Sequence, residues 1–127
     1  MKRLKWTGKA ILIVEDSDVV VIYYGIALKT TGATIITTMD GDEAVEICRE
    51  RDIDIILMDL YLPSSNGFDT TRRIREFNQD VPIIAHTSYN DDEEMVKSLA
   101  AGCTEFIPKP LRLKEFYSVL SKYLDKS

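Results

Sequence analysis

The stretch Ala10-Ile11-Leu12-Ile13-Val14 is followed directly by two acids, Glu15 and Asp16. An unbroken apolar run of this length is typical of a strand that is covered on both faces in a parallel sheet. Two later apolar runs are also followed directly by a charged residue, Asp59 in one case and Lys109 in the other. Because the carboxyl ends of parallel strands form the ligand crevice of an open α/β sheet, we expect these three acids and the lysine to meet there.

Apolar runs alternate five times with amphipathic stretches, which predicts βα units on a parallel sheet with helices on both faces. The predicted strands lie near residues 10–15, 33–38, 54–59, 82–87 and 104–108. The predicted helices lie near residues 17–31, 41–51, 65–77, 91–101 and 112–125. Candidate N-caps for the first four helices are Ser17 or Asp18, Asp40 or Asp42, Ser64 or Ser65, and Asn90. Gly32 and Gly102 stand where the first and fourth helices should end.

Length and composition exclude several classes of protein. A chain of 127 residues with 45% hydrophobic residues is expected to form one globular domain. Its net charge of −5 argues against binding of nucleic acid by this chain. No apolar run is long enough to span a bilayer, and the first residues lack the apolar core of a signal peptide. Cys48 and Cys103 have no metal-ligand spacing, so we expect two buried thiols in a reduced, cytoplasmic protein.

The predicted cluster of acids and lysine favours one kind of chemistry. Grouped carboxylates repel a phosphate unless a divalent cation lies between them. The lysine at the same edge of the sheet supplies the positive charge that a phosphoryl group needs. We therefore expect Mg²⁺-dependent phosphoryl transfer to a carboxylate.

Five short motifs, in order along the chain, resemble those of response-regulator receiver domains of two-component signalling. They are Glu15-Asp16-Ser17, the segment Met58-Asp59-Leu60-Tyr61-Leu62-Pro63, Gly67, the pair Thr87-Ser88, and Phe106-Ile107-Pro108-Lys109-Pro110. The resemblance implies a flavodoxin-like doubly wound α/β fold with strand order 2-1-3-4-5. It places a polar lead-in at residues 1–9 and the receiver domain at 10–125, with no output domain. The lead-in is similar to the approach to the receiver of a hybrid sensor histidine kinase.

The resemblance also assigns roles to residues. Asp59 is expected to accept a phosphoryl group from the phosphohistidine of a histidine kinase or histidine phosphotransfer protein. Asp16, Asp59 and the backbone carbonyl of Tyr61 would bind Mg²⁺, for which Mn²⁺ can substitute, and Glu15 would bind it through a water. Lys109 would neutralise the phosphoryl oxygens. Such a domain is a signalling protein and not an enzyme, although it catalyses its own phosphorylation and dephosphorylation.

Further residues are implied in the switch that follows phosphorylation. Thr87 would bond the phosphoryl oxygen, assisted by the backbone N–H of Ser88, and Phe106 would turn inward. The surface of the fourth helix, fifth strand and fifth helix would then change for a partner. We expect no membrane contact, and a monomer or a weak phosphorylation-dependent dimer. Tyr61 and Tyr89 flank the mouth of the site and are expected to slow hydrolysis of the phosphoryl group.

Two local features complete the expectations for a receiver. The first helix should leave an exposed apolar patch that includes some of Val19, Ile22 and Tyr23. The peptide bond between Lys109 and Pro110 should be cis, against the usual preference for trans. His86, the only histidine, should point to the face opposite Thr87 and be structural.

Three alternatives remain open at the level of sequence. Asp16 and Asp18 match the nucleophile motif of haloacid-dehalogenase-type phosphatases, although that reading leaves Asp59 unexplained. A flavodoxin-type electron carrier would share the strand order, but the acids after the first strand would repel a flavin phosphate. A pseudo-receiver that only binds partners would normally have lost a key acid or the lysine. Phe106 could also be an ordinary core residue.

Overall fold

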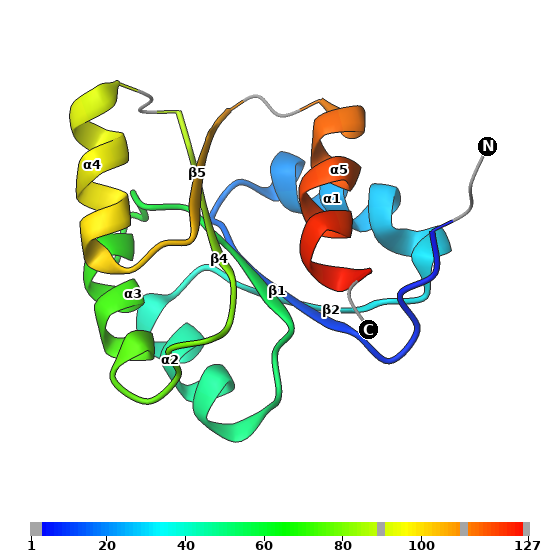
Figure 1. The fold of residues 1–127 in the computed structure, drawn as a ribbon, viewed down its shortest axis with the longest axis horizontal. Coiled ribbons are helices and arrows are strands. Elements are labelled where there is room, and N and C mark those ends of the chain that lie inside the picture. Colours follow the sequence, from blue (N-terminus) through cyan, green and yellow to red (C-terminus); the bar gives the residue numbers. More distant parts are fainter. Residues whose placement is uncertain (1–3, 89–90, 110–111, 126–127) are drawn as a thin grey trace.

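The computed structural model describes residues 4–88, 91–109 and 112–125, which form a five-stranded parallel sheet between two layers of helices (Figure 1). The strands, in order β2-β1-β3-β4-β5 across the sheet, are β1 (Ala10–Val14), β2 (Thr34–Thr38), β3 (Ile55–Met58), β4 (Ile83–Thr87) and β5 (Glu105–Pro108). The helices are α1 (Asp18–Leu28), α2 (Gly41–Glu50), α3 (Gly67–Arg75), α4 (Asp92–Ala101) and α5 (Leu113–Leu124). The predicted fold class and strand order are confirmed.

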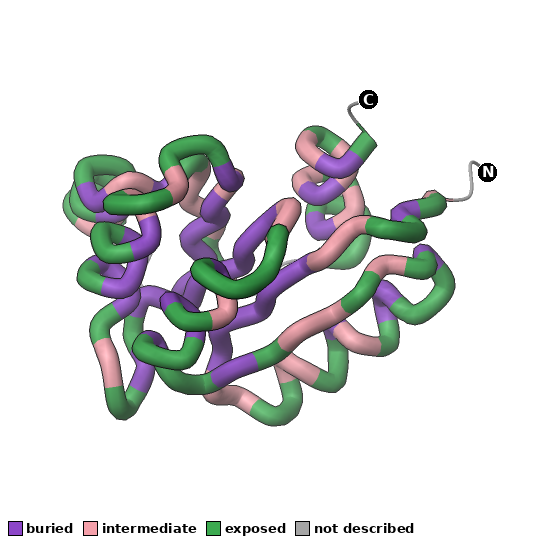
Figure 2. Tube along the Cα trace, turned by 90° about the horizontal axis from the view of Figure 1, so that it is seen from below, coloured by how far each residue is buried: buried purple, intermediate pink, exposed green. Residues whose placement is uncertain are grey.

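Alternation along the strands divides the core into two halves. Ile11 and Ile13 of β1 pack with α1 and α5, whereas Leu12 and Val14 of the same strand pack toward α2, α3 and α4. Successive side chains of a strand point to opposite faces, so an all-apolar strand needs helices on both sides. Figure 2 shows the buried residues concentrated along the central strands and on the inner sides of the helices.

The helix ends follow the predicted signals in part. Ser17 and Asp40 cap α1 and α2 as expected, and α1 continues into a short 3₁₀ turn, Lys29–Thr31, that ends at the left-handed Gly32. The expected cap of α3 at Ser64 or Ser65 is wrong, because the side chain of Asn66 accepts the N–H of Phe68 at 2.8 Å.

The hydroxyl of Ser65 has a different partner, the N–H of Gly41 at 3.0 Å, which joins the starts of α2 and α3. Asp91 caps α4, and Asn90, our candidate, lies outside the described residues. The left-handed Gly102 follows α4 as predicted.

The segment before β1 is tied to the domain by Trp6. This side chain is buried in the half of the core that α1 and α5 cover. Its backbone N–H donates to Thr31 at 2.7 Å, and its indole N–H donates to Asp125 at 2.7 Å. In the described part of the lead-in, Trp6 is therefore a core residue that links the two ends of the described chain. No helix in the described ranges is long and apolar enough to cross a bilayer.

Gly67 offers a test of how closely α3 approaches the end of β3. A Cβ at this position would lie 2.5 Å from the Cα of Leu60 and 2.6 Å from the backbone oxygen of Asp59. We expect Gly67→Ala to lower the free energy of unfolding by about 1–3 kcal/mol, because backbone and not a flexible side chain would have to move.

The matched control is Gly25→Ala in α1, where no other part of the protein lies within 4 Å of the added Cβ. This variant should be neutral, or more stable by up to about 1 kcal/mol, because alanine is the better helix former. Urea denaturation of both variants provides the measurement. Equal stability of the two would show that the α3–β3 approach is not constrained.

Candidate functional site

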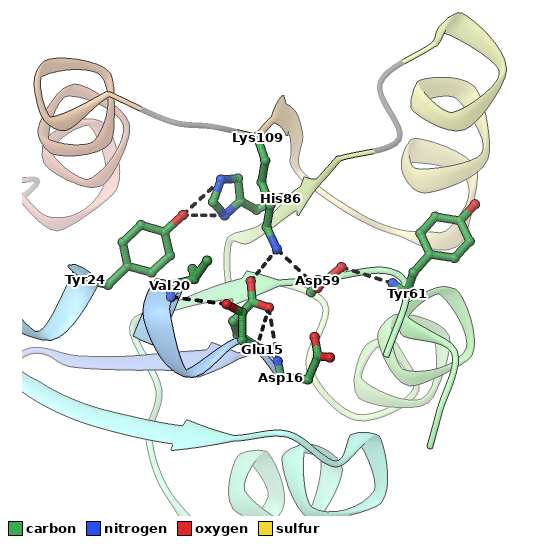
Figure 3. Close-up of polar contacts among 9 residues, drawn as sticks. Glu15, Asp16, Val20, Tyr24, Asp59, Tyr61, His86 and Lys109 are labelled. Atoms are coloured by element: carbon green, nitrogen blue, oxygen red, sulfur yellow. Dashed lines mark hydrogen bonds and ion pairs between the residues drawn. The ribbon is translucent and has the colours of Figure 1, made fainter. Parts of the chain in front are cut away.

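Three carboxylates meet at the carboxyl edge of the sheet. Glu15 and Asp16 follow β1, and Asp59 follows β3, its neighbour in the sheet. One oxygen from each carboxylate lies within 4.8 Å of the others (Figure 3). The expected convergence of the acids at one edge of the sheet is therefore present.

Glu15 is held rigidly where β1 turns into α1. One carboxylate oxygen accepts the backbone N–H groups of Asp16 and Ser17 at 3.0 and 3.2 Å, and the other is bonded by the ammonium of Lys109. The residue is only 4% exposed, and this burial raises the pKa of Glu15. The nearby Asp59 carboxylate adds to the rise, whereas Lys109 and the Ser17 N–H oppose it.

Asp59 is fixed by its backbone and by two neighbours. Its N–H donates to the carbonyl of Val14 at 3.0 Å, which continues the pairing of β3 with β1. Its carboxylate accepts the N–H of Tyr61 at 3.1 Å on one oxygen and the Lys109 ammonium at 3.2 Å on the other. Asp59 is 7% exposed, so a largely buried carboxylate lies at the strand end with a fixed orientation.

Lys109 reaches the acids from the end of β5. Its backbone N–H donates to the carbonyl of Thr87 at 2.8 Å, which keeps β5 in register with β4 beyond its last residue. Burial alone would lower the pKa of Lys109, but the bond to Glu15 and the charge of Asp59 outweigh burial and raise it. The side chain is therefore a protonated ammonium at neutral pH, and its expected contact with Asp59 is confirmed.

The donor set suits a hard divalent cation. Three carboxylates from two neighbouring strand ends present oxygen ligands, and Mg²⁺ prefers a few carboxylate oxygens with water in its other octahedral positions. Among the described residues, Lys109 is the one positive charge that the acids contact, so their negative charge is only partly neutralised. The residues present therefore fit Mg²⁺.

The remaining predicted residues are placed around this cluster. Thr87 is the buried last residue of β4, and Ser88 follows it at the surface. Phe106 is half-buried in β5 and packs against the half of the core under α2, α3 and α4. Tyr89 and Pro110 lie outside the described residues, and with them the expected cis peptide bond.

His86 lies on the face opposite the α2–α4 layer, as expected, and is buried at 4% exposure. The hydroxyl of Tyr24 in α1 lies 2.6 Å from its Nδ1, and the Tyr24 ring stacks on Phe116 of α5 at 4.6 Å between centroids. Burial, together with the charge of Lys109, lowers the pKa of His86 to about 4, so the ring is neutral at pH 7. This link between β4, α1 and α5 had no signal in the sequence beyond a lone histidine and an aromatic helix.

The exposed apolar patch on α1 is also confirmed. Val19, Ile22 and Tyr23 are 77%, 60% and 40% exposed, and we call these three residues the α1 patch. A mostly apolar cavity of about 430 Å³ lies beside the patch. Val20, His86 and Lys109 are among its lining residues, so it adjoins the lysine of the acid cluster.

A model of the response regulator receiver domain family matches residues 11–121. The chain belongs to this family. It is 33% identical to the transcriptional regulatory protein AfsQ1 of Streptomyces coelicolor over 103 residues, which cover 81% of this chain and 45% of AfsQ1. It is 31% identical to the polar-differentiation response regulator DivK of Brucella anthropi over 120 residues, 91% of this chain and 96% of DivK.

Solved receiver structures have the same fold. The receiver domain of the sensor histidine kinase PA1611 of Pseudomonas aeruginosa superposes with a TM-score of 0.85 at 31% identity, over 94% of this chain and 100% of that one. That crystal structure contains a magnesium ion coordinated in the active site cleft. Chemotaxis protein CheY4 of Vibrio cholerae, at 24% identity and a TM-score of 0.84 over 91% of this chain and 98% of that one, shows the shared fold alone.

Membership of the receiver family decides between the alternatives of fold and class. This chain is a receiver domain of two-component systems, and the phosphatase and electron-carrier readings are set aside. The acids after β1 and β3 then lie where the phosphoacceptor and metal site of a receiver domain are expected.

The buried His86 predicts a specific dependence of stability on pH. Its folded pKa of about 4 lies below the ordinary value of 6.5, so the folded receiver binds fewer protons than the unfolded chain. The stabilisation that comes from keeping His86 neutral in the fold is complete above pH 6.5 and is lost as the pH falls toward 4. At pH 5 this loss lowers the free energy of unfolding by about 2 kcal/mol. We expect His86→Gln to remove this loss, as measured by urea denaturation at pH 7.5 and pH 5.

Tyr24→Phe is the control for this prediction. It deletes the hydroxyl that contacts His86 but leaves the imidazole buried, and burial is the larger cause of the lowered pKa. The pH dependence of Tyr24→Phe should therefore stay close to that of the wild type. If wild type and His86→Gln lose stability in parallel, His86 does not titrate as described.

Proposed function

We propose that Asp59 of this receiver domain accepts a phosphoryl group from the phosphohistidine of a histidine kinase or histidine phosphotransfer protein, in the presence of Mg²⁺. The observation that carries the proposal is the largely buried Asp59 carboxylate, held between the acids Glu15 and Asp16 and the ammonium of Lys109. Stability alone does not favour three carboxylates beside a single ammonium at a sheet edge, because unpaired buried charges are costly. Such a cluster therefore points to a functional role.

The residues around Asp59 account for each part of the transfer. A carboxylate nucleophile needs no general base to attack phosphorus while the bond to the histidine nitrogen breaks. Lys109 would stabilise the negative charge on the equatorial phosphoryl oxygens. Hydrolysis by water would later regenerate Asp59 and release inorganic phosphate.

Mg²⁺, when bound, would neutralise the phosphoryl oxygens and the acids together, and Mn²⁺ would serve in its place. Asp16, Asp59 and the carbonyl of Tyr61 would hold it directly, with Glu15 acting through a water. The magnesium ion in the active site cleft of the related PA1611 receiver supports this assignment.

The switch would begin at Thr87, which would bond the phosphoryl group together with the N–H of Ser88. Thr87 is buried at the end of β4, and the backbone N–H of Lys109 donates to its carbonyl. Movement of Thr87 would therefore affect both β4 and β5. Phe106 is half-buried and would turn inward when Thr87 moves. The signal would be read on the α4–β5–α5 surface, where Met95, Val96 and Leu99 are exposed.

The phosphohistidine partner would dock on the α1 patch. Exposed apolar side chains grouped beside a polar site are typical of interaction surfaces. The adjoining cavity reaches Lys109, so a helix seated there would bring its histidine close to Asp59. This surface contains Tyr23, an aromatic of the kind that often dominates binding energy.

Wider features of the protein are proposed on the same basis. Residues 10–125 would form the receiver and residues 1–9 its lead-in, in a monomer or a weak phosphorylation-dependent dimer. The acidic net charge argues against contact with nucleic acid. Two buried free thiols suit the reducing cytoplasm, where the receiver would act on its own or as part of a hybrid histidine kinase.

Acetyl phosphate tests the phosphoacceptor directly. With Mg²⁺ present, intact mass spectrometry of the wild type should show the gain of one phosphoryl group, which hydroxylamine removes. Asp59→Asn should abolish the gain, and Asp16→Asn should raise the Mg²⁺ concentration that is needed. Asp69→Asn, at an exposed aspartate of α3, is the matched control and should behave as wild type. Phosphorylation that survives Asp59→Asn would contradict the assignment.

The docking surface is tested by comparing two phosphoryl donors. Val19→Glu places a charge in the α1 patch and should slow transfer from phosphorylated histidine phosphotransfer proteins by ten-fold or more, on the order of the loss of a buried apolar contact. Its phosphorylation by acetyl phosphate should be unchanged. Val96→Glu, at another exposed valine on α4, is the control and should leave both rates unchanged. Equal slowing with both donors would place the defect in the site and not in docking.

A further inference from the structure

Tyr61 connects the phosphoacceptor to α4. Its backbone N–H donates to the carboxylate of Asp59 at 3.1 Å, and its hydroxyl donates to the carboxylate of Glu94 in the first turn of α4. In Figure 3 the ring of Tyr61 points away from Asp59 and toward this helix. One residue therefore contacts both the site and the helix that carries part of the proposed output surface.

Other contacts hold the ring and its partner in place. The Tyr61 ring packs edge-on against Phe68 of α3, with centroids 5.9 Å apart and planes at 85°. The ammonium of Lys97 lies 4.8 Å from the centre of the Phe68 ring and 4.0 Å from the carboxylate of Glu94. The Glu94 side chain is only 17% exposed beneath these neighbours, so the hydrogen-bond acceptor is itself ordered.

The position of this ring matters for access to the site. A cavity of about 440 Å³ lies beside Asp16, and Tyr61 and Asn66 are among its other lining residues. Tyr61 is 39% exposed, so its side chain has solvent on one side and is not enclosed in the core. Rotation about its χ1 torsion to another staggered position would move the ring off α4, and the bond to Glu94 and the packing on Phe68 oppose that rotation.

We propose that Glu94 is a positioning residue that holds the Tyr61 ring away from the mouth of the phosphoacceptor site. When the hydrogen bond between Tyr61 and Glu94 is broken, the ring covers Asp59 and hinders both small phosphoryl donors and the water of hydrolysis. A partner that engages Glu94 on α4 would then slow loss of the phosphoryl group while it reads the signal. This inference rests on the proposed phosphorylation of Asp59.

Three variants with one matched control test the effect on rates. Glu94→Ala and Tyr61→Phe each remove the hydrogen bond and keep the ring, so both should slow phosphorylation by acetyl phosphate and later phosphoryl loss. The expected decrease is up to about five-fold, the population shift that one hydrogen bond of ordinary strength can impose. Glu94→Gln keeps an acceptor oxygen and should restore most of the rate. Glu93→Ala removes a neighbouring exposed carboxylate of α4 and should match the wild type.

A second background separates the ring from a general effect on α4. Tyr61→Asn removes the ring, so phosphoryl loss in this background should be at least as fast as in the wild type. In this background the further change Glu94→Ala should have no effect, because no ring remains to be released. A full effect of Glu94→Ala without the ring would overturn the proposal.

Hydrogen exchange of the unphosphorylated protein tests the link without any phosphoryl chemistry. Glu94→Ala should increase exchange in the peptide that contains residues 59–66, and Glu93→Ala should not. Unchanged exchange in Glu94→Ala would refute the positioning role even if Asp59 is phosphorylated normally. A wild type that takes no phosphoryl group, with exchange increased as expected, would refute the proposed function and leave the link between Glu94 and Tyr61 established.

Discussion

The ammonium of Lys109 is the charge on which the rest of the site depends. It contacts two carboxylates, Glu15 and Asp59, and all three side chains are largely withdrawn from water, with exposures of 16%, 3% and 9%. Buried charges of one sign are tolerated only when they are paired, because desolvation is costly and removal of one partner leaves the others uncompensated. The lysine therefore keeps the acids together in the absence of a cation and retains charge for an incoming phosphoryl group.

The backbone of the sheet makes this pairing possible. Lys109 is positioned by the pairing of β5 with β4, and Asp59 by the pairing of β3 with β1. Glu15 also accepts two N–H groups at the turn into α1, so the charge cluster and the start of that helix are fixed by one side chain. The α1 patch begins just beyond this turn, and the proposed docking surface is consequently held in a fixed position relative to the phosphoacceptor.

The sequence was sufficient for features that depend on local pattern. Continuous apolar runs located the strands, and the acids after β1 and β3 located the site, because parallel strands bring their carboxyl ends to one edge. The cap of α3 was missed because Ser64, Ser65 and Asn66 are all capable caps, and a distant N–H from Gly41 engages the hydroxyl of Ser65. The contacts of Tyr24 with His86 and of Tyr61 with Glu94 join residues 62 and 33 positions apart, and no local periodicity records such pairs.

Those two tyrosines extend the site in opposite directions. Tyr24 joins β4, next to the buried Thr87, to α1 and, through its stacked ring, to α5. Tyr61 joins the end of β3 to α4 on the other side of the sheet. Each ring combines aromatic packing with a hydrogen-bonded hydroxyl, an arrangement that fixes orientation better than packing alone. Tyr61 contacts Asp59 directly and so places α4, the helix proposed to carry the signal, one residue away from the phosphoacceptor. Tyr24 instead ties α1, the helix proposed to receive the phosphoryl donor, to His86, which precedes the buried Thr87 in β4.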